Sequence, residues 1–128
     1  MGISIQDAIE RATVANDSDG YVSQYLYKQL LKDRKYRSSK KNIYYNLGVV
    51  FLKKEDYASA ADNFKNAVSL DSRDYESYYN LGIIYDNYLS NRTNALYYYN
   101  GYLKTAADYL EKKKVENWAA ALRKNREE

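Results

Sequence analysis

The side chains in this chain that could do acid–base chemistry are carboxylates, and they gather at two places. Glu55 and Asp56 are adjacent, and Asp71, Asp74 and Glu76 follow further along. Paired carboxylates can serve as general acid and base where a cleft raises the pKa of one of them. Both groups, however, lie at expected turns and helix starts, where acidic residues cap helices and interact favourably with the helix dipole. We therefore interpret them as structural.

The rest of the composition offers no catalytic machinery. The 128 residues include no His and no Cys. This removes the commonest general base and metal ligand, any Ser-His-Asp triad, disulfides and thiolate zinc sites. The sequence also has no glycine-rich phosphate loop and no metal-ligand spacing. We expect no enzymatic activity, no catalytic residues, no metal and no cofactor.

A basic segment is the next candidate for chemistry. Residues 32–41 hold six Lys or Arg side chains around Tyr36, a combination that can bind phosphates and stack on a base. The alternative is a solvated helix end, where cations complement the negative pole of the helix dipole. The net charge of the chain is only +3, and no fold-level nucleic-acid-binding motif is present. We favour the solvated helix end and do not expect a nucleic-acid partner.

Turn-forming residues divide the chain into segments of helical length. Between these breaks, apolar residues recur at three- and four-residue spacing, which is typical of amphipathic helices, and no segment alternates as a strand would. The absence of Pro also suits helices. We predict an all-α fold. The last two expected helices could also form one long helix over residues 93–125. The expected helices cover residues 3–15, 20–36, 41–54, 57–70, 75–89, 93–105 and 109–125.

An internal repeat links the middle helices. The sequence Tyr-Tyr-Asn-Leu-Gly at residues 44–48 recurs at residues 78–82, an offset of 34 residues. Ala60 and Phe64 then correspond to Ala95 and Tyr99 at an offset of 35. One residue has therefore been added in the turn between the two helices of the second copy.

This repeat resembles the tetratricopeptide repeat (TPR) family over roughly residues 41–105. The family pattern of aromatic, Leu-Gly, aromatic, Ala and aromatic positions is filled in both copies. In this sequence the matching residues are Tyr44, Leu47, Gly48, Phe51, Tyr57, Ala60, Phe64 and Ala67, and then Tyr78, Leu81, Gly82, Tyr85, Ala95 and Tyr99. The chain departs from the pattern at Ser72, where the family usually has Pro, and at Tyr102, which corresponds to Ala67.

The resemblance implies a right-handed superhelix of antiparallel helical hairpins, a TPR-like α-solenoid with a C-terminal capping helix. Two repeats alone rarely bury a continuous core, so the flanking helices must complete the stack. We expect residues 1–128 to form a single domain. Its parts are an N-terminal hairpin at 1–40, repeats at 41–74 and 75–108, and the capping helix at 109–128.

The two repeated glycines have a physical reason. A glycine in mid-helix costs about 1 kcal/mol relative to Ala, so Gly48 and Gly82 must allow a favourable contact. We expect the missing side chain to let the second helix of each hairpin approach closely. Small Ala60 and Ala95 would face the gap, and bulky residues would pack around it.

In TPR proteins the first helices line a concave groove, and the resemblance implies that a peptide binds on that inner face. Asn side chains offer two donors and one acceptor, so Asn46 and Asn80 can grip a peptide backbone. Alternatively, each Asn bonds only to a neighbouring helix. A clamp for a C-terminal carboxylate is not expected, because Val49 occupies a position that needs a second Asn. The candidate peptide-binding residues are Asn42, Tyr45, Asn46, Val49, Lys53, Glu76, Tyr79, Asn80, Ile83 and Asn87.

The expected partner is therefore a protein or a peptide, and the chain would act as a scaffold or assembly adaptor. A second hypothesis is a homo-oligomer joined through the terminal helices, since several aromatic residues there exceed the needs of one helix pair. They are Tyr97, Tyr98, Tyr99, Tyr102 and Trp118. No segment reads as a signal peptide or as a membrane span of roughly 18–20 apolar residues, which favours the cytoplasm.

Overall fold

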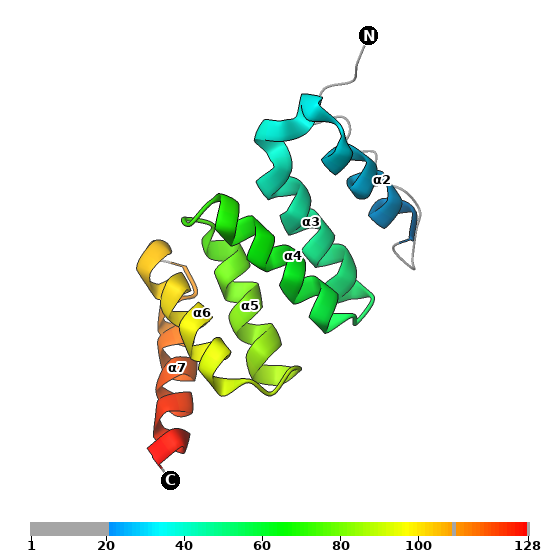
Figure 1. The fold of residues 1–128 in the computed structure, drawn as a ribbon. Coiled ribbons are helices and arrows are strands. Elements are labelled where there is room, and N and C mark those ends of the chain that lie inside the picture. Colours follow the sequence, from blue (N-terminus) through cyan, green and yellow to red (C-terminus); the bar gives the residue numbers. More distant parts are fainter. Residues whose placement is uncertain (1–20, 109, 128) are drawn as a thin grey trace. The chain divides into compact units, whose positions relative to one another are not determined.

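The structure of the chain is a computed structural model that describes residues 21–108 and 110–127. These residues contain six α-helices, one 3₁₀-helix and no strand, which confirms the all-α prediction for this part of the chain (Figure 1). The helix expected at residues 3–15 lies outside the described residues. By its internal contacts the chain divides into two compact units, Met1–Leu70 and Asp71–Glu128.

The first unit is built around a helical hairpin. Its elements are α2 (Tyr21–Lys32), the 3₁₀-helix η1 (Arg34–Ser39), α3 (Lys40–Lys53) and α4 (Tyr57–Leu70). A short turn joins α3 to α4, and the two helices pack side by side (Figure 1). Their shared core is almost fully closed to solvent and consists of Ile43, Leu47, Ala60, Phe64 and Ala67. The 3.6-residue periodicity of the sequence therefore predicts the packed faces correctly.

Helix α2 packs against α3 and is tied to its end by one side chain. The Lys54 ammonium donates a hydrogen bond to Gln24 Oε1 at 2.7 Å. The same ammonium lies 4.0 Å from the centroid of the Tyr21 ring, a cation–π contact. Tyr27 on α2 is 2 % exposed and is thus part of the core of this unit.

The expected helix at residues 20–36 is shorter in the structure. Helix α2 ends at Lys32, and the backbone of Asp33 is extended. The side-chain carboxylate of Asp33 accepts a hydrogen bond from the Lys35 amide at 3.0 Å. An Asp side chain that bonds the backbone two residues on competes with helix continuation. The chain then turns through η1, where the buried Tyr36 side chain anchors the segment.

The second unit repeats the hairpin and adds one helix. Its elements are α5 (Tyr75–Asn87), α6 (Arg92–Thr105) and α7 (Lys112–Glu127). Helix α6 packs against both α5 and α7. The core combines side chains of all three helices that are at most 1 % exposed, namely Leu81, Ile84, Ala95, Tyr99, Val115 and Ala119.

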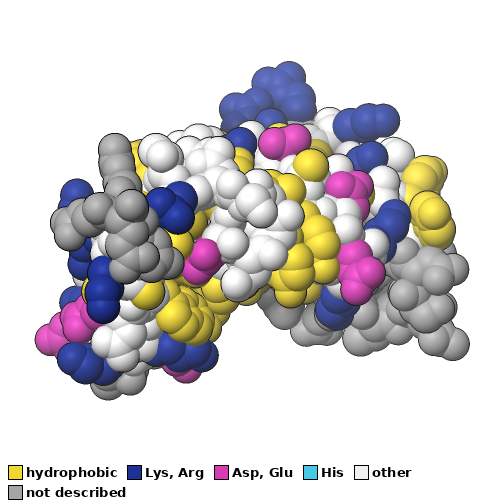
Figure 2. All heavy atoms as spheres, turned by 90° about the horizontal axis from the view of Figure 1, so that it is seen from below, with side chains coloured by type: hydrophobic (Ala, Val, Ile, Leu, Met, Phe, Trp, Pro, Cys, Tyr) yellow, Lys and Arg dark blue, Asp and Glu magenta, His cyan; other side chains and the backbone are white. Residues whose placement is uncertain are grey.

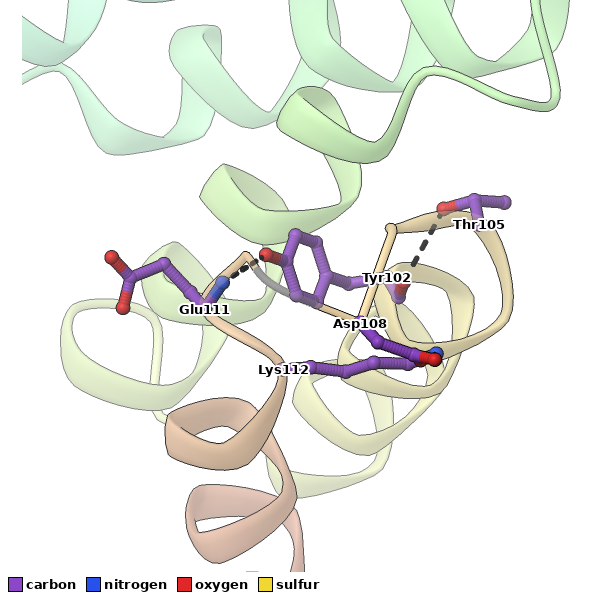
Figure 3. Close-up of polar contacts among 5 residues, drawn as sticks. All are labelled: Tyr102, Thr105, Asp108, Glu111 and Lys112. Carbon is purple, nitrogen blue, oxygen red and sulfur yellow. Dashed lines mark hydrogen bonds and ion pairs between the residues drawn. The ribbon is translucent and has the colours of Figure 1, made fainter.

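The helical conformation is interrupted between α6 and α7, so residues 93–125 form two helices and not one. Ala106 ends α6 in an extended conformation. The Tyr102 hydroxyl accepts a hydrogen bond from the Glu111 amide at 2.9 Å, which fastens the start of α7 to α6 (Figure 3). Lys112 and Asp108 pair at 2.9 Å beside this bond (Figure 3). The last helix begins at Lys112, three residues later than expected.

Both repeated glycines are buried and receive an aromatic ring from the second helix of their hairpin. A Cβ atom on Gly48 would lie 2.7 Å from the Phe64 ring, and one on Gly82 would collide with the Tyr99 ring. The predicted close approach is therefore confirmed. The atoms nearest to each missing Cβ belong to the ring of Phe64 or Tyr99. That Ala60 and Ala95 face the gap stays a prediction. Both alanines are fully buried in the same interfaces.

The second unit contains a further notch that the repeat does not show. A Cβ atom on Gly101 of α6 would collide with the Tyr78 ring of α5. Each helix of this hairpin thus receives a ring from the other, Tyr99 on Gly82 and Tyr78 on Gly101. In the first unit Asn66 stands at the position that corresponds to Gly101, so its hairpin has one notch only.

The turn of each hairpin holds one non-glycine residue in the left-handed region. Glu55 has φ of 61° and Ser90 has φ of 49°, and the two positions correspond at the offset of 35 residues. In the first turn the Asp56 amide donates to the Phe51 carbonyl and the Glu55 amide to the Leu52 carbonyl, which is the Schellman pattern of helix termination. The second turn shares the left-handed residue but has other hydrogen bonds, since the Leu89 amide donates to the Ile84 carbonyl and the Asn91 amide to the Tyr85 carbonyl.

Gly48→Leu should destabilise the first unit by about 3 kcal/mol, because the added side chain would displace the buried Phe64 ring. Chemical denaturation followed by circular dichroism measures the change. Val49→Leu is the matched control, since its side chain is only half-buried, and we expect little change there. Equal stability of Gly48→Leu and the wild type would contradict the notch.

Glu55→Gly should stabilise the chain by about 0.5–1 kcal/mol, because glycine adopts the left-handed conformation without steric cost. Asp62→Gly is the control, because Asp62 is an exposed acidic residue inside helix α4. This variant should lower the stability by about 0.3 kcal/mol. Thermal melting of the two variants should show shifts of opposite sign. Shifts of the same sign would refute the assigned turn geometry.

Candidate functional site

Helix α3 carries the first half of the predicted site on one incompletely covered face. Asn42 and Lys53 are exposed, and Tyr45, Asn46 and Val49 are half-buried. The opposite face is buried in the hairpin through Ile43, Leu47, Val50 and Phe51. Spacings of three and four residues place the five predicted residues along one side of the helix.

Helix α5 shows the same pattern at the same register. Glu76 and Asn87 are exposed, and Tyr79, Asn80 and Ile83 are half-buried. The buried face consists of Ser77, Leu81, Gly82, Ile84 and Tyr85. None of the ten predicted site residues is buried, so each face can be reached by a ligand within its own unit. We refer to these two sets of five residues as the α3 face and the α5 face.

The tyrosines of the two faces rest on rings of neighbouring helices. The Tyr45 centroid lies 5.6 Å from Phe64 in an edge-to-face contact. The Tyr79 centroid lies 5.4 Å from Tyr102 and 6.0 Å from Trp118. Such contacts stabilise aromatic pairs beyond their buried area. They also hold each tyrosine in a defined position while part of its side chain stays exposed.

The α5 face has a neighbour that the sequence does not identify as part of a site. Trp118 of α7 lies 5.8 Å from Tyr99 as well as against Tyr79. The Lys114 ammonium lies 5.1 Å from the Trp118 ring centroid. A hydrogen bond with the Tyr79 hydroxyl, together with the nearby Glu111 carboxylate, raises the pKa of Lys114. The cation is thus retained at the edge of the Tyr79 ring.

The asparagines of the two faces keep their side-chain amides unpaired. Neither Asn46 nor Asn80 forms a side-chain hydrogen bond within the described part of the chain. By contrast, the Asn63 amide donates to the Ser59 carbonyl at 2.9 Å, and Asn91 caps α6. No buried side-chain polar atom lacks a partner among the described residues, so the amides of Asn46 and Asn80 reach solvent.

Asp56, Asp71 and Asp74 form capping and turn hydrogen bonds, as the sequence predicts for acidic residues at turns and helix starts. The Asp74 carboxylate accepts hydrogen bonds from the Ser77 hydroxyl at 2.6 Å and from the Ser77 amide at 3.3 Å, and so caps α5. Asp56 accepts from the Ser59 amide of α4 at 3.2 Å, and Asp71 from the Arg73 amide at 3.0 Å. Within residues 21–108 and 110–127, no cluster of three or more acidic side chains could hold a metal ion.

A buried tyrosine of α6 is hydrogen-bonded to α5, the helix that carries the α5 face. Tyr99 is 1 % exposed, and its hydroxyl donates to the Asp86 carboxylate at 2.8 Å. Burial, and then the Asp86 carboxylate, raises the pKa of Tyr99 far above its ordinary value. Burial raises the pKa of Tyr78 and of Tyr102 as well. In the second unit, burial therefore favours the neutral form of these three tyrosines.

Comparison with models of protein families finds no match to this chain, and comparison with curated proteins finds none either. In the described residues no helix is long and apolar enough to cross a membrane.

Alkaline pH should test the buried tyrosine. The pKa of Tyr99 is raised in the folded state, so its contribution to stability is complete below the unfolded-state value of about 10 and falls as the pH rises above it. Tyr99→Phe should cost about 1 kcal/mol at pH 7 through loss of the hydrogen bond to Asp86. Thermal melting at rising pH should show the wild type and the variant converging.

Tyr97→Phe is the control for this experiment, because Tyr97 is 66 % exposed. Its melting curves should follow those of the wild type at every pH. A constant difference between Tyr99→Phe and the wild type from pH 7 to pH 11 would show that the Tyr99 hydroxyl ionises equally in both states. That result would contradict the raised pKa.

Proposed function

We propose that this chain is a non-catalytic, TPR-like protein-interaction module that holds an extended peptide or a protein segment on the α3 and α5 faces. The right-handed superhelix, with α7 as its cap, is the arrangement that we propose for the assembled repeats. Two features support the proposal: the repeated ring-on-glycine hairpins, and the matching exposure of the first helix in each of them.

One observation carries the proposal, namely the unpaired amides of Asn46 and Asn80. They stand at the same register in two separate hairpins, and each is half-buried without a hydrogen-bond partner among the described residues. A side-chain amide of this kind can donate to a peptide carbonyl and accept from a peptide N–H, because both groups lie on one planar unit. An extended peptide, whose backbone groups are unpaired, supplies such partners.

The tyrosines would supply most of the binding free energy. Tyr45 and Tyr79 offer apolar area with a hydroxyl, a combination enriched in interface hot spots. Contacts with Phe64 and with Trp118 hold the rings in place before a ligand arrives, so little side-chain freedom is lost on binding. Lys53 and Glu76 add one charge of each sign to the two faces, which favours a ligand of mixed charge.

The aromatic residues behind the self-association hypothesis have another use in the fold. Tyr99 and Tyr102 are buried in the second unit, and Trp118 contacts Tyr79 and Tyr99. Tyr97 alone of the five is strongly exposed. The aromatic content of the last two helices is thus largely accounted for by packing within the unit, and we favour the peptide-binding module.

The test uses peptides selected from a random library against the full chain. A double change, Asn46→Ala with Asn80→Ala, should weaken binding of the selected peptides about tenfold or more, because each amide–backbone pair contributes about 0.5–1.5 kcal/mol. Isothermal titration calorimetry measures the affinities. Neither asparagine forms a side-chain hydrogen bond with another described residue. The circular dichroism and the melting temperature should therefore stay unchanged.

Asn66→Ala with Asn100→Ala is the matched control. These two asparagines are exposed on α4 and α6, one in each unit, and their replacement should leave the affinity within about twofold. If the control pair weakens binding as much as the test pair, or if neither pair has an effect, the peptide binds elsewhere and the proposal is wrong.

A further inference from the structure

The outer side of α2 carries aromatic rings followed by cations. Tyr21, Tyr25, Lys28 and Lys32 are all exposed, and their spacings of four, three and four residues place them on one stripe of the helix. Tyr21 is 67 % exposed and Tyr25 63 % exposed. Large aromatic side chains left this open on a helix mark a surface that can take a ligand, because their burial would be favourable.

The segment η1, which follows α2 in the chain, adds three further cations. Arg34, Lys35 and Arg37 are exposed, while Tyr36 between them is 6 % exposed and anchors the segment. Burial of that one ring therefore presents the three cations to solvent. We call the set of Tyr21, Tyr25, Lys28, Lys32, Arg34, Lys35 and Arg37 the α2 stripe. On the face that Figure 2 draws, Lys and Arg side chains lie beside hydrophobic ones at several places.

The cations of the α2 stripe have no ion-pair partner among the residues that the structure describes. Lys28, Lys32, Arg34 and Arg37 form no ion pair within the described part of the chain. The one acidic residue between residues 21 and 41 is Asp33, whose carboxylate accepts from the Lys35 amide. Uncompensated cations at this density attract a polyanion and release its counterions on binding.

A solvated helix end explains only part of this surface. Lys32 is the one basic residue in the last turn of α2, and the helix dipole acts over that turn alone. Arg34 and Arg37 follow the end of α2, and of these two only Arg37 lies in the last turn of η1. The dipole also gives no reason for two exposed tyrosines on the same stripe. A ligand that has both negative charge and flat apolar faces explains the rings and the cations together.

We propose that the α2 stripe binds single-stranded nucleic acid, with phosphates on the cations and bases stacked on Tyr25 and Tyr21. Stacking platforms next to cations are the features by which proteins hold single strands without reading sequence. The Lys54 ammonium already lies on the Tyr21 ring, and it would keep that ring in place for stacking. An acidic peptide would engage the cations but would have no flat bases to stack on the rings.

This site is separate from the α3 and α5 faces and does not depend on the proposed function. The test measures fluorescence anisotropy of a labelled oligothymidylate of about twelve nucleotides with the full chain over a series of salt concentrations. If the five cations neutralise phosphates, the logarithm of the affinity should fall against the logarithm of salt with a slope of about −3.5, since each contact to a single strand contributes about −0.7.

Charge reversal tests the cations. Replacing Lys28, Lys32, Arg34 and Arg37 with Glu should abolish binding. The matched control replaces four exposed cations of the second unit, Lys104, Lys113, Arg123 and Lys124, and so changes the net charge equally. The control should retain most of the affinity at moderate salt. Equal loss in both variants would reduce the effect to net charge and would overturn the proposal.

Ring removal tests the stacking. Tyr25→Ala should weaken binding about fivefold or more, because stacking of one base on an aromatic ring contributes about 1 kcal/mol at least. Tyr25→Phe should bind like the wild type, and Tyr97→Ala, at another exposed tyrosine, should have no effect. If Tyr25→Ala binds normally, and polyglutamate binds as tightly as the oligonucleotide, the stripe is a site for acidic peptides and the proposal is wrong.

Discussion

An aromatic ring lodged against a helical glycine holds each hairpin of this chain together. Phe64 on Gly48 and Tyr99 on Gly82 are almost fully buried, and no larger residue than glycine would allow the contact. Because the ring fits at one position of the facing helix only, the contact fixes the register of the two helices as well as their separation. A slip by one turn, about 5.4 Å, would drive the ring into a side chain.

This register determines what remains open on the first helices. The interface side of α4 consists of Ala60, Ala61, Phe64 and Ala67, which offer no side-chain partner to an amide on α3. In α6 the buried hydroxyls are already bonded, Tyr99 to Asp86 and Tyr102 to the Glu111 amide. Among the described residues, the asparagines that flank the buried stripe therefore form no side-chain hydrogen bond in either unit. The tight apolar interface and the polar open face are two consequences of one packing arrangement.

The sequence predicts these hairpins well because repetition marks them. A glycine in mid-helix is costly, and its recurrence in both copies at residues 48 and 82 points to a close contact. Gly101 carries the same signal, but it occurs once, so the sequence does not predict its contact with the Tyr78 ring. The early end of α2 depends on one hydrogen bond of Asp33, which hydrophobic periodicity does not reveal. The contact of Trp118 with Tyr79 depends on how α7 packs, and no local pattern encodes it.

Trp118 is the only tryptophan in the chain, and it lies in the second unit against Tyr79 and Tyr99. The chain therefore contains an intrinsic optical probe of one unit. Its emission senses the surroundings of the α5 face directly, and nearby tyrosines can pass excitation energy to it. Melting confined to Met1–Leu70 would change the far-ultraviolet circular dichroism without removing these ring contacts. The two signals, recorded together, can thus resolve whether the units lose their structure in one step or in two.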